Sequence, residues 1–73
     1  MANTVDYILL RKIALRIKKL REENNLTQED VINDTGIHIG RVEMGKRDFS
    51  VSTLKKICKY FNISISEFFK GIK

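Results

Sequence analysis

The sequence contains no proline, a single cysteine, Cys58, and a single histidine, His38. One cysteine excludes a disulfide within the chain, and one cysteine with one histidine cannot supply the ligand set of a structural zinc site. No apolar run approaches the roughly 20 residues that a membrane-spanning helix needs. We therefore expect no metal, no cofactor and no membrane partner. A lone free thiol also favours the reducing cytoplasm as the location.

The residue patterns of catalysis are missing as well. The sequence has no paired nucleophile and base, no pair of carboxylates at metal-ligand spacing and no glycine-rich phosphate loop. A chain of 73 residues forms one small domain with little room for a substrate cavity. We therefore expect a protein that is not an enzyme.

What the sequence does contain is a composition typical of a folded domain, with 42% hydrophobic and 32% charged residues. An excess of lysine and arginine gives a formal net charge of +5, which favours a polyanionic partner. The charge is uneven, however, because residues 26–50 carry five acidic and three basic side chains. Net charge alone is therefore weak evidence for a nucleic-acid partner, and a prediction of DNA binding depends on the pattern of residues along the chain.

Apolar residues recur at helical spacing, and no segment shows the alternation of a strand pair. One stripe, on residues 6–23, consists of Leu10, Ile13, Ala14, Ile17 and Leu20. A second, on residues 51–61, consists of Val51, Leu54, Ile57, Cys58 and Phe61. Two capping boxes, Thr27 with Asp30 and Ser64 with Glu67, predict the starts of further helices. The sequence therefore predicts an all-α fold of about five helices.

Between residues 27 and 45 the pattern predicts two short helices joined by a tight turn. Asn33 and Asp34 favour turns and are expected to end the first helix. Thr35 is a natural cap for the second helix, and Gly45 is a typical helix stop. Such a pair is the outline of a helix-turn-helix, whose second helix enters the major groove of DNA while the first lies against the phosphates.

Four ordered segments sharpen this outline: LTQED at 26–30, GRVEMGKR at 40–47, SVSTL at 50–54 and FNISISEFF at 61–69. Together they resemble the phage-repressor-like helix-turn-helix family of the xenobiotic-response-element type, whose members are bacterial and phage regulators. The resemblance implies a compact five-helix, lambda-repressor-like domain over residues 11–70, with residues 1–10 as an N-terminal extension of the first helix. It also implies a sequence-specific DNA-binding transcriptional regulator, expected to be a repressor, that acts as a homodimer on a palindromic operator.

The same resemblance implies which residues contact double-stranded DNA. They are Thr27, Gln28, Thr35, Gly36, Ile37, His38, Gly40, Arg41, Lys46 and Arg47. Gln28 would hold a phosphate, Arg41 would reach a guanine edge or a phosphate, and Ile37 could meet a thymine methyl group. Other roles stay open, because Ile37 could belong to the core and Arg41 could pair with an acidic neighbour, Glu43 or Asp34.

The chain departs from the family pattern in one place, because the segment from Gln28 to Glu43 is one helical turn short. If Gly36 keeps its place in the turn, the second helix begins at His38 and is truncated. If instead the residues after Gly40 keep theirs, Thr35 caps the second helix and the first helix loses its last turn. The longer match after Gly40 favours the second placement.

The sequence is also compatible with two functions other than a DNA-binding regulator without a protein partner. One is an antitoxin-like regulator with a protein partner held on one of the last two helices. The other is a protein-interaction module that has lost DNA binding, which the acidic middle of the chain favours. A core this small also suggests a homodimer that buries some of the apolar residues near both ends, namely Ile8, Leu9, Leu15, Phe68, Phe69 and Ile72.

Overall fold

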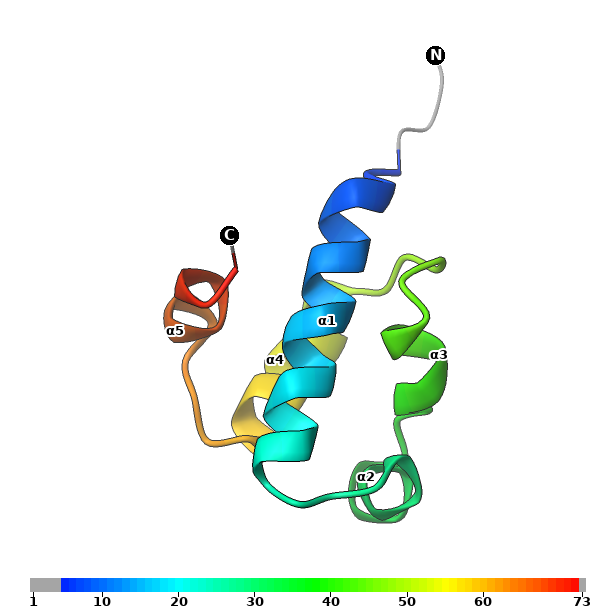
Figure 1. Cartoon of the computed structure of the whole chain (residues 1–73), viewed down its shortest axis with the longest axis vertical. Coiled ribbons are helices and arrows are strands. Elements are labelled where there is room, and N and C mark those ends of the chain that lie inside the picture. Colours follow the sequence, from blue (N-terminus) through cyan, green and yellow to red (C-terminus); the bar gives the residue numbers. More distant parts are fainter. Residues whose placement is uncertain (1–4, 73) are drawn as a thin grey trace.

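The computed structural model describes residues 5–72, which fold into helices without any strand. The helices are α1 (Tyr7–Glu23), α2 (Gln28–Thr35), α3 (Ile39–Glu43), α4 (Val51–Tyr60) and α5 (Ile65–Lys70). The long helix α1 runs through the middle of the molecule, with α4 behind it, α5 on one side and the pair α2 and α3 on the other (Figure 1). The predicted all-α, five-helix fold is confirmed.

Local side-chain bonds begin four of these helices. At α2 the Thr27 hydroxyl accepts the Asp30 N–H at 3.0 Å, and the Asp30 carboxylate accepts the Thr27 N–H at 2.8 Å. Ser64 and Glu67 form the same reciprocal box at α5, and Ser50 caps α4. The two capping boxes were predicted from the sequence, because capping depends only on residues within one helical turn. Asp6 caps α1 in the same way.

The core lies between α1, α4, α5 and the inner faces of α2 and α3. Its buried members are Ile13, Ile17, Leu20, Val31, Ile39, Leu54, Ile57, Cys58, Phe61 and Phe68. Burial raises the pKa of the Cys58 thiol, which is consistent with a packing role. One expectation is wrong, because Val51, on the first turn of α4, is 75% exposed. Phe68 is fully buried, so it belongs to the core and is not among the apolar residues that a dimer could cover.

The boundary between α2 and α3 differs from the favoured prediction. Helix α2 continues through Asn33 and Asp34 to Thr35, whose hydroxyl donates to the carbonyl of Val31 one turn back, at 2.7 Å. Gly36 ends the helix with a φ of +74°, a conformation that costs glycine little. Thr35 therefore caps no following helix, and its hydroxyl accepts the N–H of Ile37 at 3.0 Å.

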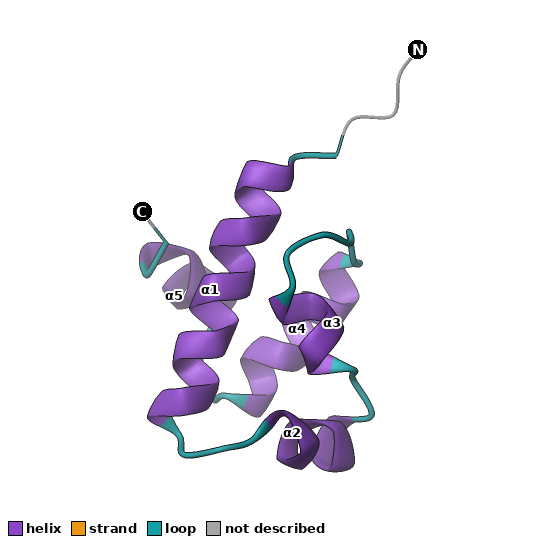
Figure 2. Ribbon diagram, turned by 45° about the vertical axis from the view of Figure 1, so that its right-hand side comes forward, coloured by secondary structure: helices purple, strands orange, loops and turns teal. Residues whose placement is uncertain are grey.

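As a result, the missing helical turn has been lost from α3. Helix α3 begins after His38 and contains five residues, whereas α2 contains eight. Figure 2 shows the two helices joined by a short connection. The placement that keeps Gly36 in the turn is the one that the structure adopts. None of the described helices is long and apolar enough to cross a bilayer.

Candidate nucleic-acid interface

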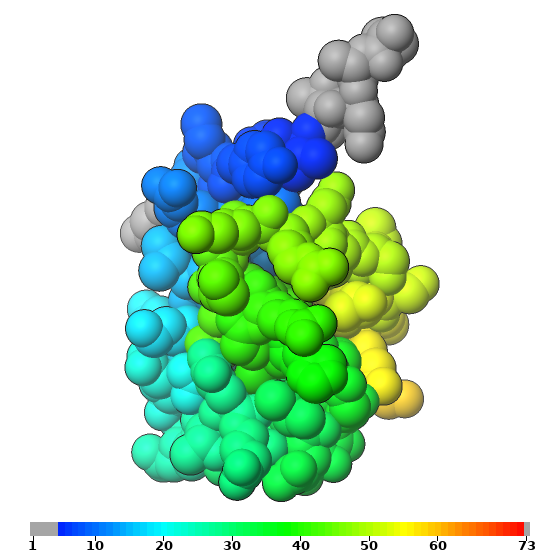
Figure 3. All heavy atoms as spheres, turned by 90° about the vertical axis from the view of Figure 1, so that its right-hand side faces the viewer, coloured from blue at the N-terminus to red at the C-terminus, as the bar shows by residue number. Residues whose placement is uncertain are grey.

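The predicted contact residues lie on a single face of the molecule. Figure 3 shows this face, with α2 at the bottom, α3 at the centre and the loop between α3 and α4 above it. Seven of the predicted residues are exposed: Thr27, Gln28, Gly36, His38, Arg41, Lys46 and Arg47. The other three are half-buried: Thr35, Ile37 and Gly40. The structure thus brings together residues from two helices, the turn between them and a loop.

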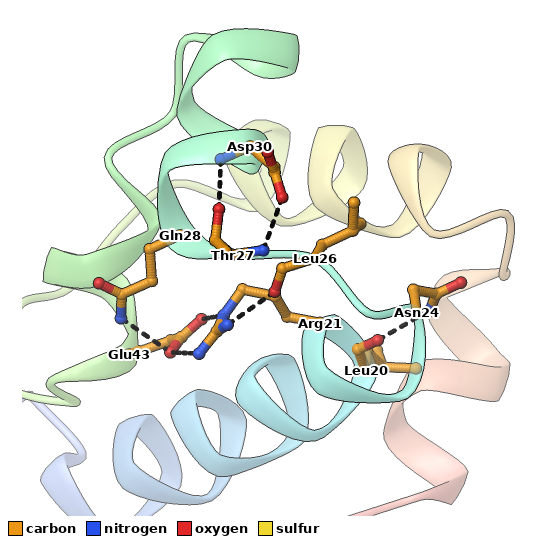
Figure 4. A network of polar contacts seen from close by, with 8 residues as sticks. All are labelled: Leu20, Arg21, Asn24, Leu26, Thr27, Gln28, Asp30 and Glu43. Atoms are coloured by element: carbon orange, nitrogen blue, oxygen red, sulfur yellow. Dashed lines mark hydrogen bonds and ion pairs between the residues drawn. The ribbon is translucent and has the colours of Figure 1, made fainter.

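An ion pair holds α3 against the end of α1. The Arg21 guanidinium donates to both carboxylate oxygens of Glu43, from Nε at 2.7 Å and from Nη2 at 3.1 Å (Figure 4). Its Nη1 also donates to the carbonyl of Leu26 at 2.8 Å. Both side chains are almost fully shielded from water, and the hydrogen bond to Glu43 raises the pKa of Arg21. Such a bidentate pair fixes both distance and angle between two elements.

The same carboxylate orients Gln28, the first residue of α2. The Gln28 Nε2 group donates to Glu43 Oε1 at 3.1 Å, and the amide lies over Gly40 of α3 (Figure 4). A β-carbon at Gly40 would come within 3.0 Å of Gln28 Oε1. The absence of a side chain at Gly40 therefore leaves room for Gln28. One amide hydrogen of Gln28 remains available to a ligand at the N-terminal end of α2.

Arg41 projects from α3 without a partner among the described residues. Glu43 is engaged by Arg21 and Gln28, and Asp34 accepts a hydrogen bond from the Tyr60 hydroxyl at 2.6 Å. That bond raises the pKa of Tyr60 to about 12. The alternative in which Arg41 pairs with Glu43 or Asp34 is therefore wrong, and its guanidinium is free to meet a ligand.

A shallow hollow of about 270 Å³ lies beside Arg41. Its apolar lining comes from Ile37, Val42 and Phe49, and its polar rim from Arg41, Arg47, His38 and Asp48. Ile37 also packs against the core, which is one of the two roles left open by the sequence. Its contact with a thymine methyl group stays a prediction. The sequence reasoning missed Val42 and Phe49, because a half-buried apolar residue at helical spacing is indistinguishable from core.

Charge is divided across this face. The exposed acidic residues of α2 are Glu29, Asp30 and Asp34, of which Asp30 is held by its capping box. The exposed cations Arg41, Lys46 and Arg47 lie on α3 and the following loop. Among residues 5–72, no group of acidic, histidine and cysteine side chains could hold a metal ion. The arrangement suits a polyanion that approaches from the side of the loop.

Comparisons with known proteins agree with this geometry. A helix-turn-helix family model matches residues 17–68. An uncharacterized helix-turn-helix-type transcriptional regulator of Methanocaldococcus jannaschii is 37% identical over 57 residues, which cover 74% of this chain and 86% of that protein. The restriction-modification controller protein C.Esp1396I, crystallised as a tetramer with its natural 35-base-pair operator, superposes with a TM-score of 0.75 at 32% identity. That match covers 85% of this chain and 86% of the controller chain.

Proposed function

The chain belongs to the phage-repressor-like helix-turn-helix family, and we propose that it is a sequence-specific transcriptional repressor that binds operator DNA as a homodimer. The family is one of DNA-binding regulators and not of enzymes. The observation that carries the proposal is Arg41, which is exposed on α3 and has no partner among residues 5–72, on a helix that the Arg21–Glu43 pair fixes in place. We also place the protein in the cytoplasm, where the thiol of Cys58 stays reduced.

In this proposal α3 enters the major groove and α2 lies against one DNA strand. His38 and Arg41 face base edges from the start and the middle of α3, and Ile37 offers an apolar surface to a thymine methyl group. Gln28 gives its remaining amide hydrogen to a phosphate, with Thr27 beside it. Gly36 and Gly40 allow close approach, and Thr35 keeps one lone pair for a donor on the DNA.

We propose that a second copy of the chain covers an apolar groove between α1, α4 and α5. The groove has a volume of about 190 Å³ and includes Leu9, Phe49, Val51, Leu54 and Phe69 in its lining. Leu9 is 40% exposed, Phe69 39% and Val51 more still, so the groove offers apolar surface to a partner. It adjoins the loop that follows α3, so a two-fold axis there would keep both copies of α3 near each other. The assembly of the controller protein on its operator supports a second copy as the occupant.

Selection of bound sequences from a random duplex pool, at about 100 mM salt, tests the proposal. We expect enrichment of a palindrome whose half-sites are about 34 Å apart, one turn of DNA. Enrichment of a sequence without symmetry would contradict the homodimer. It would favour an antitoxin-like regulator that binds a protein partner on α4 or α5. No enrichment at any salt would favour a protein-interaction module, and the acidic surface of α2 would then be the place to seek a partner.

A further inference from the structure

The first turns of α1 lie directly against the loop that carries Lys46 and Arg47. Gly45, at the start of this loop, is buried with a φ of +69°, and a β-carbon there would lie 3.1 Å from Arg11 Cα and 3.4 Å from Ala14 Cβ. With no side chain at Gly45, the backbones of α1 and the loop come into contact. Figure 3 shows the N-terminal part of α1, in blue, bordering the loop on the face that contains α3.

Arg11 therefore adds a cation to the edge of this face. Its side chain is exposed. Among residues 5–72 Arg11 makes no ion pair, because the one ion pair there joins Arg21 to Glu43. Side chains on a helix lean toward its N-terminus, which for α1 is the end beside the loop (Figure 1). The acidic residue of the loop, Asp48, accepts the N–H of Phe49 at 2.9 Å.

We propose that Arg11 contacts a backbone phosphate of the DNA next to those held by Lys46 and Arg47, so that the phosphate-binding surface extends from the loop onto α1. The inference rests on the proposed function and adds a contact that lies outside the helix-turn-helix itself. A guanidinium suits this role because it can meet two phosphate oxygens at once. It would increase affinity for every sequence alike and would not read bases.

The neighbouring residue Lys12 provides a matched control. It is also an exposed cation, but its side chain lines a different hollow, with Arg16, Gly71 and Ile72 on the α5 side of α1. Removing either charge lowers the net charge equally. A difference in DNA binding between Arg11→Ala and Lys12→Ala therefore reflects where the charge lies on α1 and not the overall charge of the protein.

The experiment measures affinity for the selected duplex over a range of salt concentrations, for wild type, Arg11→Ala, Arg11→Gln and Lys12→Ala. We expect both Arg11 variants to reduce the slope of log K against log salt by about 0.9 per half-site, with unchanged base preference. Lys12→Ala should keep the wild-type slope. Equal slopes in wild type and the Arg11 variants, or the same reduction in Lys12→Ala, would overturn the contact while leaving the proposed function intact. A wild-type protein that binds no duplex would overturn both.

Discussion

At the scale of single residues, the proposed reading of bases depends most on Arg41. It is the one long cationic side chain on α3, whose sequence is IGRVE. Any bidentate hydrogen bonding to guanine from this helix must therefore come from Arg41. Arg41→Ala should weaken binding to the preferred site by about 1–3 kcal/mol and relax preference at one base position in each half-site. Binding of both proteins to every single-base variant of the site measures this. Uniform loss over all sequences would assign Arg41 to a phosphate instead.

A second residue-scale prediction concerns the carboxylate that joins three helices. Glu43→Ala leaves the shielded guanidinium of Arg21 without its partner and releases the amide of Gln28. The free energy of unfolding should fall by about 2–3 kcal/mol. Glu43→Gln, which keeps an acceptor for Arg21, should lose less. Urea unfolding of the three proteins measures this, and equal stability of wild type and Glu43→Ala would show that the pair does not hold α3 in place.

At the scale of helices, the helix starts marked by capping boxes could be predicted from the sequence, whereas the boundary between α2 and α3 could not. Capping boxes such as that of Thr27 and Asp30 involve one helical turn, so the sequence contains all the information they need. Thr35 can cap a new helix or bond back into the old one, and both choices satisfy its hydroxyl. The left-handed turn at Gly36 decides between them. Glycine permits that conformation without requiring it.

The α2 capping box also predicts a pH dependence of stability. The hydrogen bond from the Thr27 backbone lowers the pKa of Asp30 below its ordinary value of 3.8. A carboxyl group with a lower pKa when folded stabilises the protein fully above its unfolded pKa, and the contribution is lost as pH falls through the folded pKa. Below about pH 4 the melting temperature of wild type should therefore fall more steeply than that of Asp30→Asn. Parallel melting curves for the two proteins across this range would contradict the assignment.

At the scale of the whole molecule, the polar contacts that hold the helices together join distant parts of the chain. The Arg21–Glu43 pair spans 22 residues, the Tyr60–Asp34 bond 26 and the bond from Arg16 to the Phe68 carbonyl 52. Local patterns of hydrophobicity and capping say nothing about such pairs. The sequence therefore predicted which residues would be exposed on the face formed by α2, α3 and the following loop better than which polar groups would hold these elements together.

The homodimer is a prediction at the same scale. Leu9 and Leu15 are both exposed leucines of α1, but Leu9 lines the groove between α1, α4 and α5, whereas Leu15 faces the hollow beside Gly71. Leu9→Asp should therefore abolish self-association, because a charge would be buried at the contact. Leu15→Asp should leave it unchanged. Sedimentation equilibrium measures both, and an unaffected dimer in Leu9→Asp would place the contact elsewhere.

The central claim is that the face formed by α2, α3 and the following loop contacts DNA. A titration of the isotope-labelled chain with the selected duplex, followed by amide chemical shifts, tests it most directly. We expect the largest changes at Gln28, at residues 36–41 and at Lys46 and Arg47. The lysine-lined hollow of Lys55, Lys59 and Ser64, which offers similar charge elsewhere, should change little. Changes concentrated around Lys55 and Lys59, with α3 unaffected, would contradict the account.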